Sequence, residues 1–197
     1  MTTKLYNGKT SITNEEINEL PLRSFEGKIV VISDPENLQP AFEEIGDHDH
    51  IGFDTETKPV FVRGHYNKVA ILQIALEEKV FLIRLRATGL APEIIHFLQN
   101  EKIKKAGVAI RDDIKALLHL NRFTPSGFVE LTHLTKATGL EVESVKKLTG
   151  LLLGFRISKS AQTSNWEAEQ LDAKQISYAA TDAWVCLQIY KKLLPFS

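Results

Sequence analysis

The sequence predicts an α/β domain in which helices cover the faces of one mixed sheet. Three observations lead to this fold class. Residues 51–55, 69–76 and 80–85 are short apolar runs joined by brief connections, which is typical of a meander of neighbouring strands. A strand pattern at residues 104–109 then alternates with helical patterns. A long helical pattern then closes the chain at residues 173–194.

The patterns divide the chain near residue 26. Residues 1–26 are polar, and we interpret them as an N-terminal extension with one short helix at residues 14–20. Residues 27–197 contain the main strand and helix patterns, and they are numerous enough for one domain with a substantial core.

A strand and a helix open this domain. Residues 28–32 form a β-branched run, which predicts a strand. Asp34 and Pro35 then combine a preferred N-cap with proline at the first helical position. The apolar residues that follow at helical spacing predict an amphipathic helix, and they are Leu38, Phe42 and Ile45.

The meander comes next and leads into a mostly helical second half. Residues 69–76 are apolar almost throughout, as expected for a strand that is buried on both faces. The last helix has a capping box, in which Asp172 is the N-cap and Gln175 follows three residues later. Four shorter helices are expected before it, at residues 92–100, 112–120, 131–138 and 144–153.

Composition limits the possible classes of protein. The hydrophobic fraction of 43% and the charged fraction of 25% are ordinary for a globular protein. A net charge of −1 argues against a broad surface that coats nucleic acid, and it leaves room for a local basic groove. The single cysteine, Cys186, cannot form an internal disulfide. With no apolar run of signal-peptide or membrane-spanning length, we expect a cytoplasmic protein without a membrane partner.

Two acids follow the apolar start of the strand at residues 51–55. Asp54 and Glu56 are two positions apart, so both side chains point to the same face of a strand. Two carboxylates on one face beside a buried sheet repel each other unless a cation lies between them. Mg²⁺ and Mn²⁺ prefer oxygen ligands and suit such a pair. The alternative is an exposed turn in which Thr55 and Thr57 are solvated.

A third acid lies on the last helix. Tyr178 and Asp182 are four residues apart and therefore share a helix face. Small neighbours let this helix approach the sheet closely, and they are Ala179, Ala180 and Ala183. Burying an unpaired carboxylate there is costly, and a metal bound jointly with Asp54 would remove that cost. The alternative is an exposed Asp182 beside a core tyrosine.

A fourth acid opens the helix at residues 112–120. Asp112 and Asp113 both occupy its first turn, where an acid is also an ordinary partner of the helix dipole. We expect one of the two, Asp112, to serve only as a helix cap. The other would reach the mouth of the site, because the preceding strand delivers the start of this helix to a sheet edge.

Three stretches of this sequence resemble the exonuclease motifs of the DEDD superfamily. They are Phe-Asp-Thr-Glu at residues 53–56, Gly-Val-Ala-Ile-Arg-Asp-Asp-Ile-Lys-Ala-Leu-Leu at 107–118, and Tyr-Ala-Ala-Thr-Asp-Ala at 178–183. The tyrosine four residues before the last acid resembles the DEDDy branch, which includes ribonuclease D and the Werner syndrome protein exonuclease domain. Further matches lie at residues 69–74, 128–131 and 159–166, and one departure is Glu-Ala-Glu-Gln at 167–170, where relatives often carry Arg-Pro.

This resemblance implies a fold and an activity. The fold would be ribonuclease H-like, with a mixed sheet of five to six strands flanked by helices. The activity would be a metal-dependent 3′–5′ exonuclease that releases nucleoside 5′-monophosphates from the 3′ end of DNA or RNA. Two Mg²⁺ or Mn²⁺ ions would be held by the motif acids, which are Asp54, Glu56, Asp113 and Asp182. Tyr178 would orient the attacking water, and Asp113 is preferred over Asp112 because it holds the motif's position before the apolar helix.

Substrate contacts are expected just after the first motif. Thr57, Lys58, Arg63, His65 and Tyr66 could reach the terminal nucleotide or its phosphates, and an ordinary solvated loop is the alternative. A second basic set consists of Lys146, Lys147, Arg156 and Lys159.

Two rival functions stay open at this point. One is a catalytically silent nucleic-acid or protein-binding module on the same fold, whose usual mark would be a lost acid, and none is lost. The other is a metal-dependent phosphatase that acts on small phosphate esters.

Overall fold

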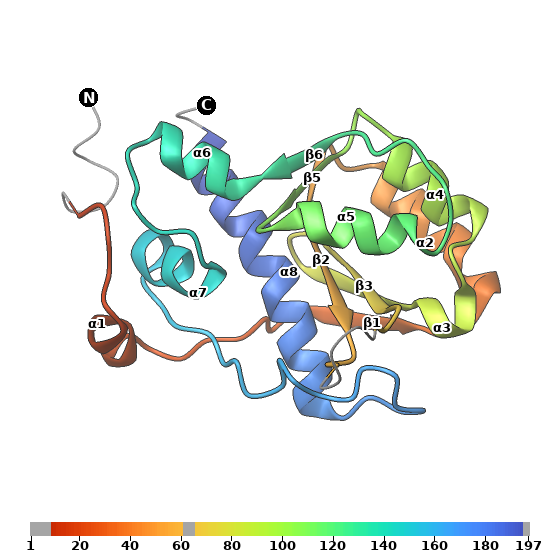
Figure 1. Cartoon of the computed structure of the whole chain (residues 1–197), viewed down its shortest axis with the longest axis horizontal. Coiled ribbons are helices and arrows are strands. Elements are labelled where there is room, and N and C mark those ends of the chain that lie inside the picture. The colour runs from red at the N-terminus through yellow and green to blue at the C-terminus, as the bar shows by residue number, and fades with distance from the viewer. Residues whose placement is uncertain (1–8, 61–65, 195–197) are drawn as a thin grey trace.

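The computed structural model of the chain describes residues 9–60 and 66–194. Its centre is a six-stranded sheet in which the strands lie in the order β1-β4-β3-β2-β5-β6 (Figure 1). The strands are β1 (Lys28–Ile32), β2 (His50–Thr57), β3 (Val69–Ala75), β4 (Lys79–Arg84), β5 (Lys104–Gly107) and β6 (Phe128–Glu130). The sheet has the predicted size.

The strand directions make the sheet mixed. β3 runs antiparallel to both β2 and β4, and the three strands form the predicted meander. β1 is parallel to β4, β5 is parallel to β2, and β6 is parallel to β5. β2 therefore lies inside the sheet between β3 and β5, so the acids that it carries start from a rigid element.

Helices cover both faces of this sheet (Figure 1). On one face, α8 (Ala173–Leu193) packs against β2, β3 and β4. On the other face lie α2 (Leu38–Gly46), α4 (Pro92–Gln99) and α5 (Ile110–Leu118). The remaining helices are α1 (Asn14–Glu19), α3 (Leu85–Thr88), α6 (Leu131–Ala137) and α7 (Val145–Leu148).

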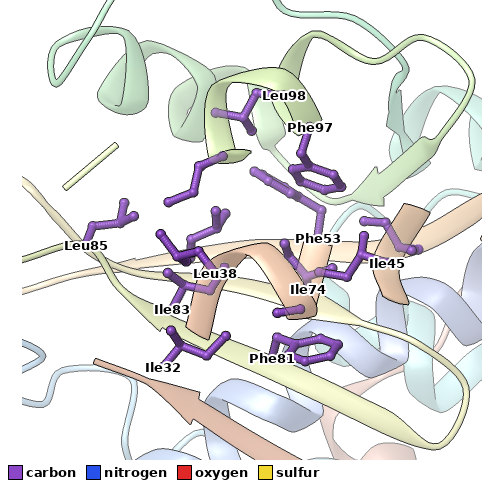
Figure 2. Close-up of a cluster of buried hydrophobic side chains, with 14 of the residues drawn as sticks. Ile32, Leu38, Ile45, Phe53, Ile74, Phe81, Ile83, Leu85, Phe97 and Leu98 are labelled. Atoms are coloured by element: carbon purple, nitrogen blue, oxygen red, sulfur yellow. The ribbon is translucent and has the colours of Figure 1, made fainter. Parts of the chain in front are cut away.

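The core between the sheet and α2 and α4 fixes the orientation of β2. Ile51 and Phe53 of β2 are fully buried in it. Figure 2 shows Phe53 in the same cluster as Leu38, Ile45 and Phe97. Since neighbouring side chains of a strand point to opposite faces, Gly52, Asp54 and Glu56 face α8 instead. Apolar burial on one face of β2 thus aims its two acids at the other face.

The structure differs from the sequence predictions around α5. The strand predicted at residues 104–109 ends at Gly107, because Ala109 adopts a left-handed backbone (φ 60°) and α5 begins at Ile110. Asp112 is therefore not the helix cap, and that prediction was wrong. The Glu130 carboxylate instead accepts hydrogen bonds from the backbone amides of Ala109 and Ile110, both at 3.1 Å.

Other differences concern short elements. α3 and β6 were not predicted from the sequence, because they have four and three residues and are too short to show a period. The helix predicted at residues 144–153 is α-helical only over Val145–Leu148 and continues as a π-helix over Thr149–Leu153. The capping box of Asp172 and Gln175 on α8 is confirmed.

Two further predictions concern membrane-spanning segments and the N-terminal boundary of the domain. Among the described residues, no helix combines the length and the apolar character that crossing a bilayer requires. The division into an extension and a domain at residue 26 stays a prediction.

Candidate active site

The site forms where α8 crosses β2. A β-carbon built on Gly52 would lie 1.9 Å from the Ala183 carbonyl oxygen, so only glycine allows this crossing. Ala179, Ala180 and Ala183 are fully buried at the contact, as expected from their small size. This close approach brings Asp182 of α8 next to the acids of β2.

Three carboxylates meet there. One oxygen from each of Asp54, Glu56 and Asp182 lies within 4.8 Å of the oxygens from the other two. Glu56 and Asp182 are buried, with 8% and 3% of their surface exposed, and Asp54 is half-buried. The alternatives of an exposed turn at Asp54 and an exposed Asp182 therefore do not hold.

Burial and mutual repulsion disfavour the charged forms of these acids. Burial raises the pKa of Glu56 to about 8, and the charge of Asp182 adds to the effect. The pKa of Asp54 rises well above its ordinary value for the same reason, with further contributions from Asp113 and Asp182. Burial also raises the pKa of Asp182. The surroundings therefore do not stabilise all of the negative charge that the ionised carboxylates would carry.

One basic side chain balances part of this charge. Lys159 Nζ lies 2.6 Å from Asp182 Oδ2 and also lies over the Tyr178 ring, 5.2 Å from the ring centroid. The second oxygen of Asp182, Oδ1, is buried and has no hydrogen-bond partner among the described residues. Sequence reasoning placed Lys159 in a general basic set and missed its contact with Asp182.

Asp113 reaches the site from the other side of β2. Its Oδ1 accepts a hydrogen bond from the hydroxyl of Thr55, which lies between Asp54 and Glu56 in β2. This hydrogen bond links α5 directly to β2 at the site. Burial raises the pKa of Asp113 to about 6, although the Thr55 hydroxyl opposes this shift. Asp113 does not belong to the group of three mutually close carboxylates. Asp112 is exposed and forms an ion pair of 3.1 Å with Lys115.

Tyr178 lies one turn before Asp182 and is 6% exposed. Burial raises the pKa of its hydroxyl far above the ordinary value, and the charge of Asp182 is the next cause. The ring packs against Trp166 with a centroid distance of 5.8 Å. Tyr178 is therefore neutral at ordinary pH and can offer its hydroxyl proton to a neighbour in the site.

Two more polar side chains support the site and were missed by sequence reasoning. Gln73 is the register partner of Asp54 on β3 and is fully buried, and its side chain acts to lower the pKa of Glu56 against the effect of burial. Glu130 fixes the start of α5, as described above, and so holds the helix that carries Asp113. Both lie in stretches that matched the family motifs, which was the available signal.

The predicted substrate residues have different settings. Thr57 and Lys58 are half-buried at and just after the end of β2, and Lys58 Nζ lies 3.6 Å from Glu167 Oε2. Tyr66 is 92% exposed and lines a hollow of about 570 Å³. Arg63 and His65 lie outside the described residues. Glu167 belongs to the stretch that departs from the family pattern, and its backbone carbonyl accepts a hydrogen bond from Arg86 at 3.2 Å.

Two members of the second basic set make structural contacts instead. Arg156 Nε donates to the Leu20 carbonyl oxygen at 3.1 Å. Lys146 Nζ donates to Asn14 Oδ1 at 3.3 Å. Both side chains thus tie residues before β1 to the segment that precedes α8.

The residues present fit a divalent cation. The donor set is entirely oxygen, which Mg²⁺ and Mn²⁺ prefer. Within the part of the chain that the structure describes, Asp182 Oδ1 is a buried acceptor without a donor, and an unpaired buried acceptor is costly. A cation bound among Asp54, Glu56 and Asp182 would satisfy that oxygen and relieve the repulsion that raises the pKa values.

Comparison with known proteins identifies similar chains. Residues 29–196 match the sequence model of a family described as 3'-5' exonuclease. The chain is 34% identical over 186 residues to the bifunctional 3'-5' exonuclease/ATP-dependent helicase WRN of Mus musculus, an alignment that covers 89% of this chain and 13% of that protein. It is 28% identical over 169 residues to ribonuclease D of Sphingobium indicum, which covers 83% of this chain and 42% of the enzyme.

A solved structure has the same fold. The crystal structure of Escherichia coli RNase D superposes with a TM-score of 0.77 at 24% identity, covering 85% of this chain and 44% of that one. The likeness shows that the fold is ribonuclease H-like, as expected. This chain spans less than half of the length of both curated relatives. Because the family model covers most of its sequence, the chain belongs to the 3'-5' exonuclease family.

Proposed function

We propose that this protein is a 3′–5′ exonuclease that hydrolyses DNA or RNA with two divalent ions and releases nucleoside 5′-monophosphates. The observation that supports it best is the meeting of three buried or half-buried carboxylates from β2 and α8 beside the Tyr178 ring. A binding module that had lost catalysis would have no need to retain three acids whose burial is costly.

In this proposal, each residue of the site has a separate role. Asp54, Glu56 and Asp182 would hold one divalent ion, and Asp113 together with Asp54 would hold a second. When bound, such ions stabilise the charges on the attacking and leaving oxygens and lower the pKa of water. Tyr178 would orient the attacking water through its hydroxyl. The Thr55 hydroxyl holds the Asp113 carboxylate and keeps it directed toward β2.

The substrate would approach the exposed side of this cluster. Thr57 and Lys58 lie on the segment that leaves Glu56, and exposed Tyr66 offers a ring on which a base can stack. Lys58, and Arg63 in the stretch outside the described residues, would position phosphates rather than read sequence.

The cytoplasmic location expected from the sequence stays a prediction.

The test uses strands that carry a label at the 5′ end. Purified protein is incubated with DNA and RNA strands in Mg²⁺, Mn²⁺ or EDTA, and the products are separated by length. We expect a ladder that shortens one nucleotide at a time and no cleavage in EDTA. A second strand that is labelled at its last internucleotide phosphate should release this label as mononucleotide. A strand with a blocked 3′ end serves as the control for direction and should persist.

The variant Asp54→Ala should bind the strand and leave it intact, because it loses the acid assigned to both ions. Strand binding without cleavage in the wild-type protein would contradict the proposal and favour a silent binding module. Hydrolysis of p-nitrophenyl phosphate, with strands left intact, would instead indicate a phosphatase.

A further inference from the structure

Lys159 is the basic group that contacts the carboxylate cluster. Its ammonium lies 2.6 Å from Asp182 Oδ2, and 29% of its side chain is exposed, against 4% of the Asp182 side chain. The same ammonium lies 5.2 Å from the centroid of the Tyr178 ring. One lysine therefore contacts two residues of the proposed active site, an acid that would hold metal and the tyrosine that would orient water.

This contact and a bound metal would compete for the same acid. An ammonium carries a single charge and reaches one oxygen of Asp182, which leaves Asp182 Oδ1 without a partner among the described residues. A divalent ion among Asp54, Glu56 and Asp182 would bind Asp182 and repel an ammonium held against it. The ammonium contacts Oδ2 and the metal would bind at Oδ1, but both would draw on the single negative charge of Asp182, so each weakens the binding of the other.

We infer that Lys159 is the internal counter-ion of this site, which neutralises Asp182 before metal binds and must release it when metal binds. Lys159 is in this sense a positioning residue, because it keeps the acid cluster folded and free of metal while setting how tightly metal can bind. The inference rests on the proposed function, since it assumes that the three carboxylates bind a divalent ion.

The local structure allows this exchange. Lys159 lies outside the helices and strands, between Ile157, which is buried, and Ala161, which is also buried. The flanking Ser158 and Ser160 hydroxyls are 3.0 Å apart, so the turn is held at both sides of the lysine. The long, flexible side chain can therefore swing toward solvent by rotating its own bonds while the backbone keeps its place.

The test compares metal binding and stability in three variants. Lys159→Met keeps an unbranched side chain of similar length and removes the charge, and Lys159→Arg keeps the charge. Lys136→Met is the matched control, because Lys136 forms a 2.7 Å ion pair with Glu143 that is exposed on both sides. Each protein is melted in EDTA and in increasing Mn²⁺ at pH 7.5, and the Mn²⁺ dissociation constant is measured by calorimetry.

We expect Lys159→Met to melt at a lower temperature than wild type in EDTA and to bind Mn²⁺ about tenfold more tightly, which corresponds to about 1.4 kcal/mol. The rise in melting temperature on adding Mn²⁺ should therefore be larger in Lys159→Met than in wild type. Lys159→Arg and Lys136→Met should keep the wild-type dissociation constant within about twofold, a difference of about 0.4 kcal/mol.

Two results would overturn this inference. If Lys159→Met melts lower by the same amount with and without Mn²⁺, at an unchanged dissociation constant, the lysine is a structural contact only. If it binds Mn²⁺ more weakly, the lysine assists metal binding rather than competing with it. Either result leaves the exonuclease proposal standing as long as the wild-type protein shortens labelled strands, whereas wild-type protein that binds no Mn²⁺ and cleaves no strand would remove both.

Discussion

Gly52 of β2 and Ala183 of α8 are in backbone contact at the centre of the site. A β-carbon on Gly52 would lie 1.9 Å from the Ala183 carbonyl oxygen and 2.9 Å from its carbonyl carbon. Gly52 is two residues before Asp54, and Ala183 directly follows Asp182. The same contact that allows the helix to cross the strand therefore sets the distance between the acids of the two elements.

The variant Gly52→Ala should lose both stability and activity. Its methyl group meets backbone atoms, which cannot rotate away, so α8 must shift. We expect a loss of about 3 kcal/mol or more in the free energy of unfolding, at or above the usual range for overpacking. Urea unfolding gives the stability, and the strand assay should show cleavage reduced with it.

The matched control is Gly46→Ala at the end of α2. A β-carbon there meets nothing within 4 Å, and its backbone is not in the left-handed region. This variant should be as stable as wild type or slightly more stable, because alanine restricts the unfolded chain. Equal stability of Gly52→Ala and Gly46→Ala would show that the backbones of α8 and β2 are not in close contact at Gly52.

Asp112 and Asp113 are neighbours that we expect to differ widely in importance. Asp113 accepts the Thr55 hydroxyl hydrogen bond beside the site, whereas Asp112 is exposed and pairs with Lys115. Asp113→Ala should reduce strand cleavage by about 100-fold or more, since even residues behind the ligands of a metal typically contribute about 10–100-fold. Asp112→Ala should cleave at the wild-type rate within about twofold, because an exposed ion pair contributes little. If Asp112→Ala lost strand cleavage and Asp113→Ala kept it, the assignment of Asp113 rather than Asp112 to the site would be wrong.

The variant Tyr178→Phe separates the ring of this residue from its hydroxyl. The ring packs against Trp166 and keeps its volume, so the melting temperature and metal binding should stay near the wild-type values. Turnover should fall by about 10²–10⁴-fold, the usual contribution of a group that positions or transfers a proton. The control is Tyr190→Phe on the same helix, which is buried against His50 and should keep full activity. Full activity of Tyr178→Phe on the strand that wild type degrades would leave this tyrosine only a packing role.

The stability of the metal-free protein should depend on pH through Glu56. The pKa of Glu56 is about 8 in the folded protein against 4.5 ordinarily, so between these values the folded state binds more protons than the unfolded state. The contribution of Glu56 is therefore fully present below pH 4.5 and is lost as the pH rises through 8. Because a pKa difference of one corresponds to about 1.4 kcal/mol, this loss is large enough to measure.

The measurement is the melting temperature in EDTA between pH 5 and pH 8.5 for wild type and Glu56→Gln. We expect a steeper fall with pH in wild type, since glutamine does not titrate. Parallel curves for the two proteins would mean that Glu56 is already charged in the metal-free fold at low pH.

The sequence by itself determined which face each residue occupies. The two-residue spacing of Asp54 and Glu56 put both acids on one face of β2, because a strand repeats every two residues. The four-residue spacing of Tyr178 and Asp182 put them on one side of α8, and the alanines around them indicated a close contact with the sheet. These are local properties of the chain, so periodicity and residue size were enough to predict them.

Only the tertiary structure decided which partners meet across elements. Nothing in the local pattern pairs Lys159 with Asp182, Thr55 with Asp113, or Glu130 with the start of α5, and the last of these corrected the cap assigned to Asp112. Such contacts join residues that are far apart in the chain, and they depend on how α8 and α5 pack on opposite faces of β2. A periodic pattern predicts the face of the helix or strand on which a side chain lies. Which residues of other elements contact that face depends on the packing of the whole domain.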